Sequence, residues 1–282
     1  MDGILLINKK SGWTSHDVVN RLRRILHTKK IGHSGTLDPF ATGLLIVAVN
    51  KATKALLYSN FSYKTYVAEL KLGFKTSSGD LTSDIIEEKE IPHLTKEKIN
   101  QILQSFVGES TQMVPMTSAV HVNGMKLYKY AQQGIEVERP TRQIQIKYIK
   151  LLDYSNNTIK FQCLVSSGTY IRVLGEDIAE KLGTVGHLIS LNRIAFGENE
   201  SLSINQAIDL EDASEDKIQP IIDFIDLPHH YIDEDTYKKV ISGQTIPLNI
   251  KEDKVLLVYN GIGLAVYKRK KNQYFQCERG LW

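Results

Sequence analysis

Runs of apolar residues mark a series of strands in the first 200 residues. Residues 63–72 alternate most clearly: Tyr66, Ala68 and Leu70 fall on one face of an extended chain, opposite a mostly polar face. Residues 44–49 are apolar throughout, which predicts a buried strand. Further strands are predicted at residues 3–7, 143–152, 158–165 and 186–197.

Helical spacing of apolar residues predicts three helices among these strands. The first follows Thr14 or Ser15, either of which can cap its N-terminus, and its apolar residues share one face. Its arginines lie off that face, toward solvent. The other two helices are predicted at residues 95–107 and 169–182. Residues 73–84 are polar and contain glycine, so we expect a flexible loop there.

Residues 108–142 have no clear period. They contain two prolines and three glycines, and they mix lysines and arginines with Tyr128 and Tyr130. Such a mixture can hold an RNA loop by charge and by base stacking. An ordinary surface excursion is the alternative.

The last fifty residues follow a different pattern. A short helix around residues 235–241 and strands at residues 255–259, 263–267 and 273–278 predict a small β-rich module. An acidic stretch with a short helix, residues 198–235, precedes it and contains Pro220 and Pro228. We place the domain boundary between residues 228 and 229.

Composition narrows the class of protein. The apolar fraction of 42% supports a real core. No apolar run approaches the roughly 20 residues of a membrane span, and the start of the chain lacks the layout of a signal peptide. Cys163 and Cys277 have no second cysteine at metal-ligand or redox-motif spacing. We therefore expect a cytoplasmic protein without a membrane association, in which both cysteines are small core residues.

Charge is distributed unevenly, although the net charge is only +3. Residues 1–75 hold 12 Lys and Arg against 4 Asp and Glu, residues 198–235 hold 1 against 12, and residues 236–282 hold 9 against 3. Two basic ends favour an extended polyanion as partner, and nucleic acid above others. The alternative is ordinary solvated surface.

Residues 31–45 are the stretch least like a simple linker. They contain three glycines, Pro39 and a single acidic residue, Asp38. Glycine and proline give such a loop a defined shape, and the buried strand follows it directly. An aspartate held in this way is suited to chemistry. A turn stabilised by an Asx-type hydrogen bond is the alternative.

Common catalytic and cofactor motifs are missing. The serine in Gly32-His33-Ser34-Gly35 lacks the glycines two residues to either side that a nucleophile elbow requires. The sequence has neither a Gly-Lys-Ser/Thr phosphate loop nor a dinucleotide fingerprint. Apart from the adjacent His229 and His230, no histidines are paired at ligand spacing, so we do not expect a metal site.

The loop resembles the signature of the TruB family of tRNA pseudouridine synthases. The family pattern Gly-His-x-Gly-Thr/Ala-Leu-Asp-Pro-x-Ala-Thr-Gly matches residues 32–43 throughout. Further similar motifs are the N-terminal residues 2–15, the tyrosine strand Lys64-Thr65-Tyr66, residues 126–137 of the family's thumb, the arginine motif at residues 167–172, and residues 186–193. The family's Lys-Pro near the start is Lys9-Lys10 here, its Pro-Pro is Val114-Pro115, and its Arg-Arg is Asn192-Arg193.

The resemblance implies a fold of class α+β. It consists of a catalytic domain, residues 1–228, on a mixed, mostly antiparallel sheet with a thumb-like insertion at about residues 108–142. A small β-rich RNA-binding domain of the PUA type, residues 229–282, follows. The implied activity is isomerisation of uridine-55 in the T loop of tRNA to pseudouridine. The uridine is flipped out, detached from its ribose, rotated and reattached through C5.

The resemblance also implies roles for single residues. Asp38 is the nucleophile or base, Arg172 pairs with it, and Tyr66 lies against the flipped base. Tyr170 and Leu191 line the pocket, and His33 fills the space that the nucleotide vacates. From the residues alone, Tyr66 could equally be a core tyrosine and Arg172 an exposed salt-bridge partner.

No cofactor or metal is needed, since the reaction is a net isomerisation. The expected partner is the T-arm of tRNA, with no obligatory protein partner and a monomeric state. Two rival functions remain: a non-catalytic RNA-binding or RNA-folding protein, and an aspartate-nucleophile hydrolase of a small substrate.

Overall fold

The computed structural model describes residues 2–59 and 61–282, which cluster into two compact units. The first unit comprises Met1–Pro39, Gly43–Phe61 and Ile204–Trp282. The second comprises Phe40–Thr42 and Ser62–Ser203. The clustering groups the C-terminal residues with the N-terminal ones, and the boundary between residues 228 and 229 stays a prediction.

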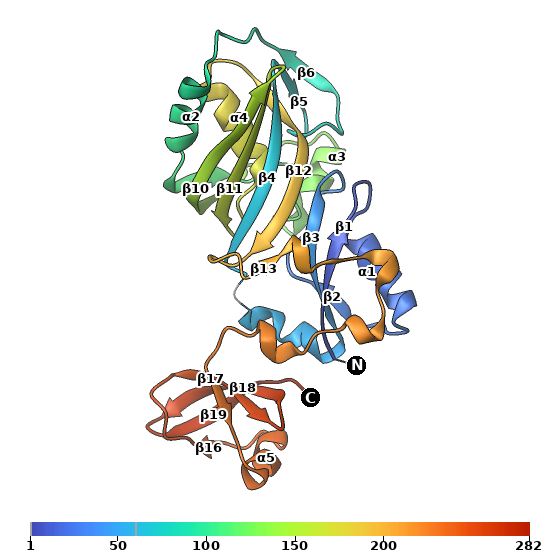
Figure 1. Cartoon of the computed structure of the whole chain (residues 1–282), viewed down its shortest axis with the longest axis vertical. Helices are drawn as coiled ribbons and strands as arrows, with labels where there is room; N and C mark the ends of the chain where they lie inside the picture. The colour runs from blue at the N-terminus through green and yellow to red at the C-terminus, as the bar shows by residue number, and fades with distance from the viewer. Residues whose placement is uncertain (1, 60) are drawn as a thin grey trace. The chain divides into compact units, whose positions relative to one another are not determined.

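In the N-terminal part of the first unit, one helix covers a set of paired strands (Figure 1). Strand β1 (Gly3–Lys9) runs antiparallel to β3 (Thr42–Val49) and parallel to the short β14 (Ile208–Asp209), and β2 (Ile31–His33) pairs with β3. Helix α1 (Ser15–Ile25) begins at Thr14, which forms a capping box with Asp17. The buried strand and the capped helix expected from the sequence are therefore confirmed.

One apolar core joins these elements. It includes Leu5 and Ile7 of β1, Val18 and Leu22 of α1, and Val47 of β3. The face of α1 that carries these apolar residues is the one predicted from their spacing, because residues three and four apart meet on one side of a helix.

The C-terminal residues of the first unit form a second, five-stranded sheet of order β15-β17-β18-β19-β16. Its core includes Val240, Val255, Tyr267 and Phe275. The elements are β15 (His229–Tyr231), α5 (Glu234–Ile241), β16 (Ile246–Pro247), β17 (Lys254–Tyr259), β18 (Ile262–Lys271) and β19 (Tyr274–Gly280). The predicted helix and three strands are confirmed. The two remaining strands have three and two residues, too few to show a period.

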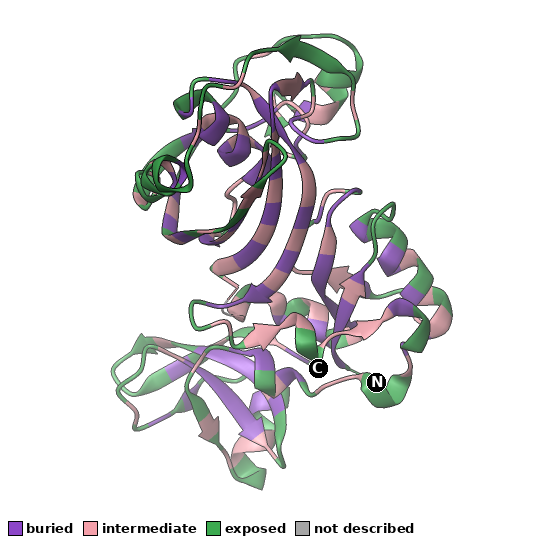
Figure 2. Cartoon of the chain, turned by 45° about the horizontal axis from the view of Figure 1, so that its top comes forward, coloured by how far each residue is buried: buried purple, intermediate pink, exposed green. Residues whose placement is uncertain are grey.

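The second unit is built on an antiparallel sheet of order β12-β4-β11-β10-β7, with β13 paired to β12. Buried residues alternate with partly exposed ones along β4 and β12 (Figure 2). The strands are β4 (Tyr63–Leu72), β7 (Gly108–Met113), β10 (Thr141–Ser155), β11 (Thr158–Ser166), β12 (Gly186–Phe196) and β13 (Leu202–Ser203). The expected α+β class with a mostly antiparallel sheet is confirmed.

Helices α2 (Lys96–Gln104) and α4 (Ile171–Lys181) pack against this sheet, α2 on β10 and α4 on β12 and β4. Gly175 brings α4 close to the strands, because a Cβ there would lie 3.0 Å from Leu188 Cδ2 and 3.3 Å from Leu70 Cδ1. The position of the first turn of α4, which carries Arg172, is thus fixed by the close packing of the next turn.

Two regions differ from the sequence-based expectation. The flexible loop predicted at residues 73–84 is wrong in part, because β5 (Phe74–Thr76) pairs with β6 (Ile85–Glu88) and the intervening Asp80 is buried. Residues 108–142 begin with β7 and continue with β8 (His121–Val122), β9 (Met125–Lys126) and α3 (Leu127–Gln132). In the acidic stretch, short 3-10 helices take the place of the expected short helix: Ile204–Gln206, Leu210–Asp212, Glu215–Lys217 and Ile221–Phe224. Two further 3-10 helices, Asn50–Lys54 and Leu56–Tyr58, follow β3. Within the described residues, no helix combines the length and apolarity needed to cross a membrane.

Candidate active site

Lys9 holds the loop that carries Asp38 in place by hydrogen bonds. This lysine is only 1% exposed, and its ammonium donates hydrogen bonds to the carbonyl oxygens of Lys10 (3.1 Å), Trp13 (2.6 Å) and Pro39 (3.2 Å). The Gly12 amide donates to the same Pro39 oxygen at 2.9 Å. Both contacts fix the residue that follows Asp38.

The residue before Asp38 is fixed as well. The Ser15 hydroxyl, at the start of α1, accepts a hydrogen bond from the Leu37 amide at 2.9 Å and is itself 3.3 Å from the Leu37 carbonyl oxygen. Asp38 is thus a half-buried carboxylate between two anchored neighbours. His33, also half-buried, lies in β2 opposite Val47 of β3.

In the second unit, Tyr66 and Leu191 lie on one face of the sheet. Leu191 of β12 is opposite Ala68 of β4, and Arg193 is opposite Tyr66. Residues two apart on a strand share a face, so Tyr66, Leu191 and Arg193 are neighbours. Arg193 is completely buried. Burial lowers the pKa of its guanidinium, and the Tyr66 phenol, within hydrogen-bonding reach, opposes that shift.

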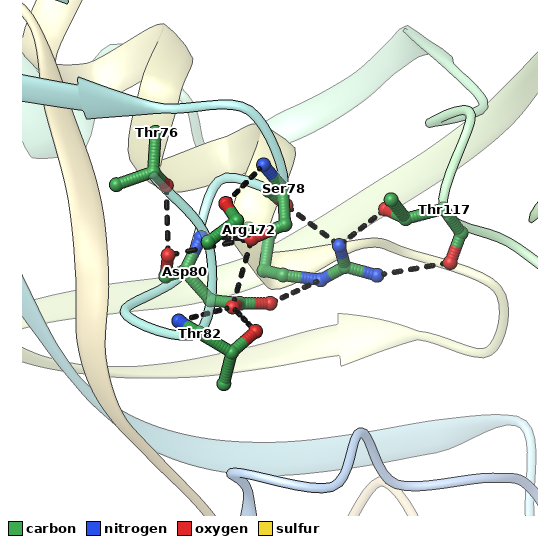
Figure 3. A network of polar contacts seen from close by, with 7 residues as sticks. Thr76, Ser78, Asp80, Thr82, Thr117 and Arg172 are labelled. Atoms are coloured by element: carbon green, nitrogen blue, oxygen red, sulfur yellow. Dashed lines mark hydrogen bonds and ion pairs between the residues drawn. The ribbon is translucent and has the colours of Figure 1, made fainter. Parts of the chain in front are cut away.

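Arg172, the second residue of α4, is 4% exposed, so its interpretation as a solvent-exposed salt-bridge partner is wrong. Its Nη1 donates hydrogen bonds to the Ser78 carbonyl oxygen at 2.7 Å and to the Thr117 hydroxyl at 2.5 Å. Its Nε lies 3.7 Å from Oδ2 of Asp80. These contacts fix the plane of the guanidinium (Figure 3).

Asp80 is fixed in turn by its neighbours on the β5–β6 connection. Its Oδ1 accepts hydrogen bonds from the Ser78 hydroxyl (2.9 Å), the Thr82 amide (2.9 Å) and the Thr82 hydroxyl (2.5 Å). The Thr76 hydroxyl donates to the Asp80 carbonyl oxygen at 2.7 Å. Figure 3 shows the carboxylate between these donors and Arg172. A carboxylate with this many donors is held in one orientation.

Tyr170 is clamped through its backbone. The side-chain amide of Gln112, on β7, accepts from the Tyr170 amide at 2.8 Å and donates to the Tyr170 carbonyl oxygen at 3.0 Å. Tyr170 is the N-cap residue of α4 and has no side-chain cap of its own. Gln112, 4% exposed, therefore fixes the entry of the helix that carries Arg172.

Of the residues predicted for the site, the second unit gathers Tyr66 and Leu191 on one sheet face and places Tyr170 and Arg172 at the start of α4. Asp38 and His33 lie in the first unit. The pairing of Arg172 with Asp38 stays a prediction.

The sequence reasoning missed Lys9, Asp80, Gln112 and Arg193. For Asp80 a signal existed, since Thr76-Ser77-Ser78-Gly79-Asp80-Leu81-Thr82 is rich in hydroxyl donors around one carboxylate. Within residues 2–59 and 61–282, no cluster of three His, Cys, Asp or Glu side chains is arranged to hold a metal ion. The chemistry available here is that of a carboxylate, a phenol and guanidinium groups.

Comparison with known proteins gives a family. The sequence model described as TruB family pseudouridylate synthase (N terminal domain) matches residues 23–171. The chain is 39% identical to tRNA pseudouridine synthase B of Streptococcus thermophilus over 96% of this chain and 98% of that protein. It is 38% identical to the protein of that name from Bacillus pumilus over 95% and 93%.

A solved structure, described as the crystal structure of a Cbf5-Nop10-Gar1 complex, contains a chain of the same fold. The TM-score is 0.74 at 26% identity, covering 99% of this chain and 85% of that one. The match to the family covers Asp38, Tyr66, Asp80 and Gln112. The chain therefore belongs to the TruB family of pseudouridylate synthases and is an isomerase.

Proposed function

We propose that this protein converts uridine-55 in the T loop of tRNA to pseudouridine. Its relatives named tRNA pseudouridine synthase B, similar over nearly their whole length, support tRNA as the substrate. The nucleotide is flipped out of the loop because the reacting atoms are otherwise hidden within folded RNA.

The observation that carries this proposal is the anchored loop of Asp38. Lys9, Gly12 and Ser15 fix the residues on both sides of the carboxylate. Such anchoring is needed for a side chain that must reach one particular atom of the substrate. Asp38 acts at the ribose–uracil centre as nucleophile or base. The glycosidic bond at N1 breaks, the uracil rotates, and the bond re-forms at C5.

The remaining residues receive supporting roles. Arg172 pairs with Asp38 and orients it in the complex with RNA, and the Asp80 network holds Arg172. In this proposal Tyr66 lies against the flipped base and takes the C5 proton. Tyr170 and Leu191 line the base pocket. His33, in β2 close to the loop, occupies the space that the nucleotide leaves in the RNA stack.

We further propose that residues 229–282 act as a PUA-like RNA-binding domain beside a catalytic domain of residues 1–228, with the thumb-like segment at about residues 108–142. The exposed Lys270 and Lys271 support this role, since they lie together at the turn between β18 and β19 of a separate five-stranded sheet. We expect a monomeric cytoplasmic enzyme that needs no protein partner and no cofactor.

The experiment uses a T-arm hairpin RNA without modifications in a buffer with EDTA. Pseudouridine is located by chemical labelling and primer extension. We expect one product, at position 55, and none when that uridine is replaced by cytidine. Modification of other uridines at a comparable rate would contradict the proposed specificity.

Asp38→Asn tests the mechanism. We expect no detectable product, while the hairpin binds within about threefold of wild type, because Asn keeps the size of the side chain and removes its charge. Asp84→Asn, at an exposed position, is the matched control and keeps full activity. Turnover by Asp38→Asn would exclude the carboxylate as the reacting group. Binding of the hairpin without any product in wild type would favour the RNA-binding alternative.

A further inference from the structure

Three cationic side chains gather at one end of the sheet in the second unit. Lys64 precedes Tyr66 by two residues on β4, so both lie on the same face. Lys64 is opposite Phe196 on β12, and Tyr66 is opposite Arg193. Arg142, near the start of β10, is close enough to Lys64 to act on its charge.

No acidic residue balances the two outer cations. Among the residues that the structure describes, neither the Lys64 ammonium nor the Arg142 guanidinium forms an ion pair with a carboxylate. The nearby Glu198 is paired with Lys147 at 2.8 Å. Glu200 accepts hydrogen bonds from Tyr148 (2.6 Å) and from Thr65 (3.0 Å). Thr65 follows Lys64 directly, so this acid serves the opposite face of the sheet.

The arrangement is unfavourable for the free protein. Burial, together with the positive charges of Arg193 and Arg142, lowers the pKa of Lys64 to about 8. A lysine in such surroundings repels its neighbours and is partly desolvated, both of which disfavour the folded state. Its contact with the Phe196 ring, 5.7 Å from Nζ to the centroid, is a weak compensation. An anion bound among these groups would remove the imbalance.

The turn after β11 leaves room for the Arg142 head group. Gly168 has a φ of +93°, and a Cβ at this position would overlap Nη1 of Arg142. The guanidinium therefore lies directly against the backbone of the turn, and only glycine allows this approach. This turn leads into Tyr170 and Arg172, so the head group of Arg142 lies beside the entry of α4.

We propose that Lys64 and Arg142 form a phosphate subsite for the phosphodiester of the nucleotide whose base lies against Tyr66, with Arg193 as a buried cation behind it. The ammonium supplies a point charge, and the guanidinium supplies a planar pair of donors. The subsite would position the ribose of the flipped nucleotide by its phosphate. This inference rests on the proposed function, since it assigns a part of the same RNA.

The first test compares RNA affinity and protein stability. Lys64→Met keeps the length and most of the apolar contact of the side chain. We expect it to weaken binding of a fluorescent T-arm hairpin roughly tenfold, without a lower melting temperature. Lys64→Arg should restore binding to within about threefold. Lys71→Met, at the other end of β4, is the control. A lower melting temperature with unchanged affinity would assign Lys64 a structural role and overturn the proposal.

The second test removes the phosphate charge instead. Methylphosphonate linkages are placed singly on the 5′ side or the 3′ side of the target uridine. If Lys64 contacts one of them, that linkage weakens binding to wild type but adds little to the defect of Lys64→Met. Additive losses at both linkages would overturn the subsite while leaving the proposed function intact. Failure of wild type to bind any T-arm hairpin would overturn both.

The pH dependence gives an independent readout. Only the protonated lysine binds a phosphate, so hairpin affinity of wild type should fall as the pH rises from 7 to 9. The charged and titratable groups that face Lys64 are Tyr66, Arg142 and Arg193. Lys64→Arg should bind equally at both pH values. An equal fall in Lys64→Arg would assign the pH effect to another group and contradict the proposal.

Discussion

The guanidinium Nε of Arg172 lies 3.7 Å from the carboxylate Oδ2 of Asp80, and both side chains are almost completely buried. Hydroxyl and amide donors of residues 78 and 82 hold the other carboxylate oxygen. Arg172, which we expect to serve catalysis, is therefore positioned by residues 73–84, a segment that the sequence pattern predicted to be a flexible loop.

Replacing Asp80 by Asn should damage both stability and activity. The substitution removes a buried negative charge beside Arg172, which lowers the free energy of unfolding by about 3 kcal/mol. We expect the single-turnover rate of pseudouridine formation to fall at least roughly tenfold, with hairpin affinity changed much less. Urea unfolding and rapid-quench kinetics measure the two effects. Wild-type values of both would show that Asp80 does not position Arg172; Asp84→Asn serves as the exposed control.

Gln112→Leu should loosen the entry of α4. It removes two hydrogen bonds between the buried Gln112 side chain and the backbone of Tyr170, which lowers the free energy of unfolding by about 2 kcal/mol. We expect kcat to fall because Arg172 follows two residues later. The matched variant is Gln143→Leu, on the neighbouring strand β10, whose side-chain amide donates to the exposed Thr111 hydroxyl at 2.9 Å. Equal effects of the two variants would contradict a special role for the clamp.

Lys9→Met should uncouple the Asp38 loop from the end of β1 and the turn that follows it. The ammonium bridges three carbonyl oxygens, including that of Pro39, and methionine cannot donate to any of them. Removing a buried charge offsets part of the lost hydrogen bonding, so we expect a stability loss of only about 1 kcal/mol beside a clear fall in kcat. Lys10→Met affects an exposed lysine and should change neither value. Unfolding and steady-state kinetics of both variants decide the point.

Asp177 on α4 should make stability depend on pH. Burial first, and then the charge of Glu180, raises the pKa of this carboxyl above its unfolded value. The charged carboxylate therefore destabilises the folded state at neutral pH. This destabilisation disappears as the pH falls through the pKa of the folded state and then that of the unfolded state. Asp177→Asn should raise the melting temperature at pH 7 and match wild type in acid.

The carboxyl group of Asp153 should affect the pH dependence of stability in the opposite direction. A hydrogen bond from Lys96 lowers its pKa, so its stabilisation is present above the unfolded pKa and is lost as the pH falls through the folded one. Asp153→Asn should slightly lower the melting temperature at pH 7, and the difference should vanish in acid. Parallel pH profiles of Asp177→Asn and Asp153→Asn would disprove both assignments.

The basic hairpin at Lys268–Lys271 divides into two kinds of residue. Arg269 is structural: its guanidinium bonds Asp253 and the carbonyl oxygens of Ile250 and Glu252, and it lies over the Phe275 ring. We expect Arg269→Met to destabilise the module. The double variant Lys270→Glu, Lys271→Glu, at exposed positions, should weaken binding of the T-arm RNA. The slope of log affinity against log salt concentration should fall by about 1 for each lost phosphate contact. If this variant binds the RNA as wild type does across a salt series, the basic hairpin does not contact the RNA.

The sequence by itself determined the elements with a strong period. Strand β4 has the predicted bounds, α1 begins at the predicted cap, and the run before Val49 is a buried strand. These patterns are local, because each reflects how neighbouring side chains divide between core and solvent. The Asp38 loop was also recognisable, since its glycines and its proline mark a shaped turn in the sequence itself.

Tertiary structure alone decided which distant groups hold the reactive ones. Asp80 meets Arg172 across 92 positions, Gln112 meets Tyr170 across 58, and Lys9 meets Pro39 across 30. No pattern in the sequence encodes such pairs, because a polar residue in a loop looks the same whether it becomes solvated or buried. Its partner is chosen only when strands β4, β7 and β12 and helix α4 pack together and exclude water, which makes every unsatisfied polar group costly.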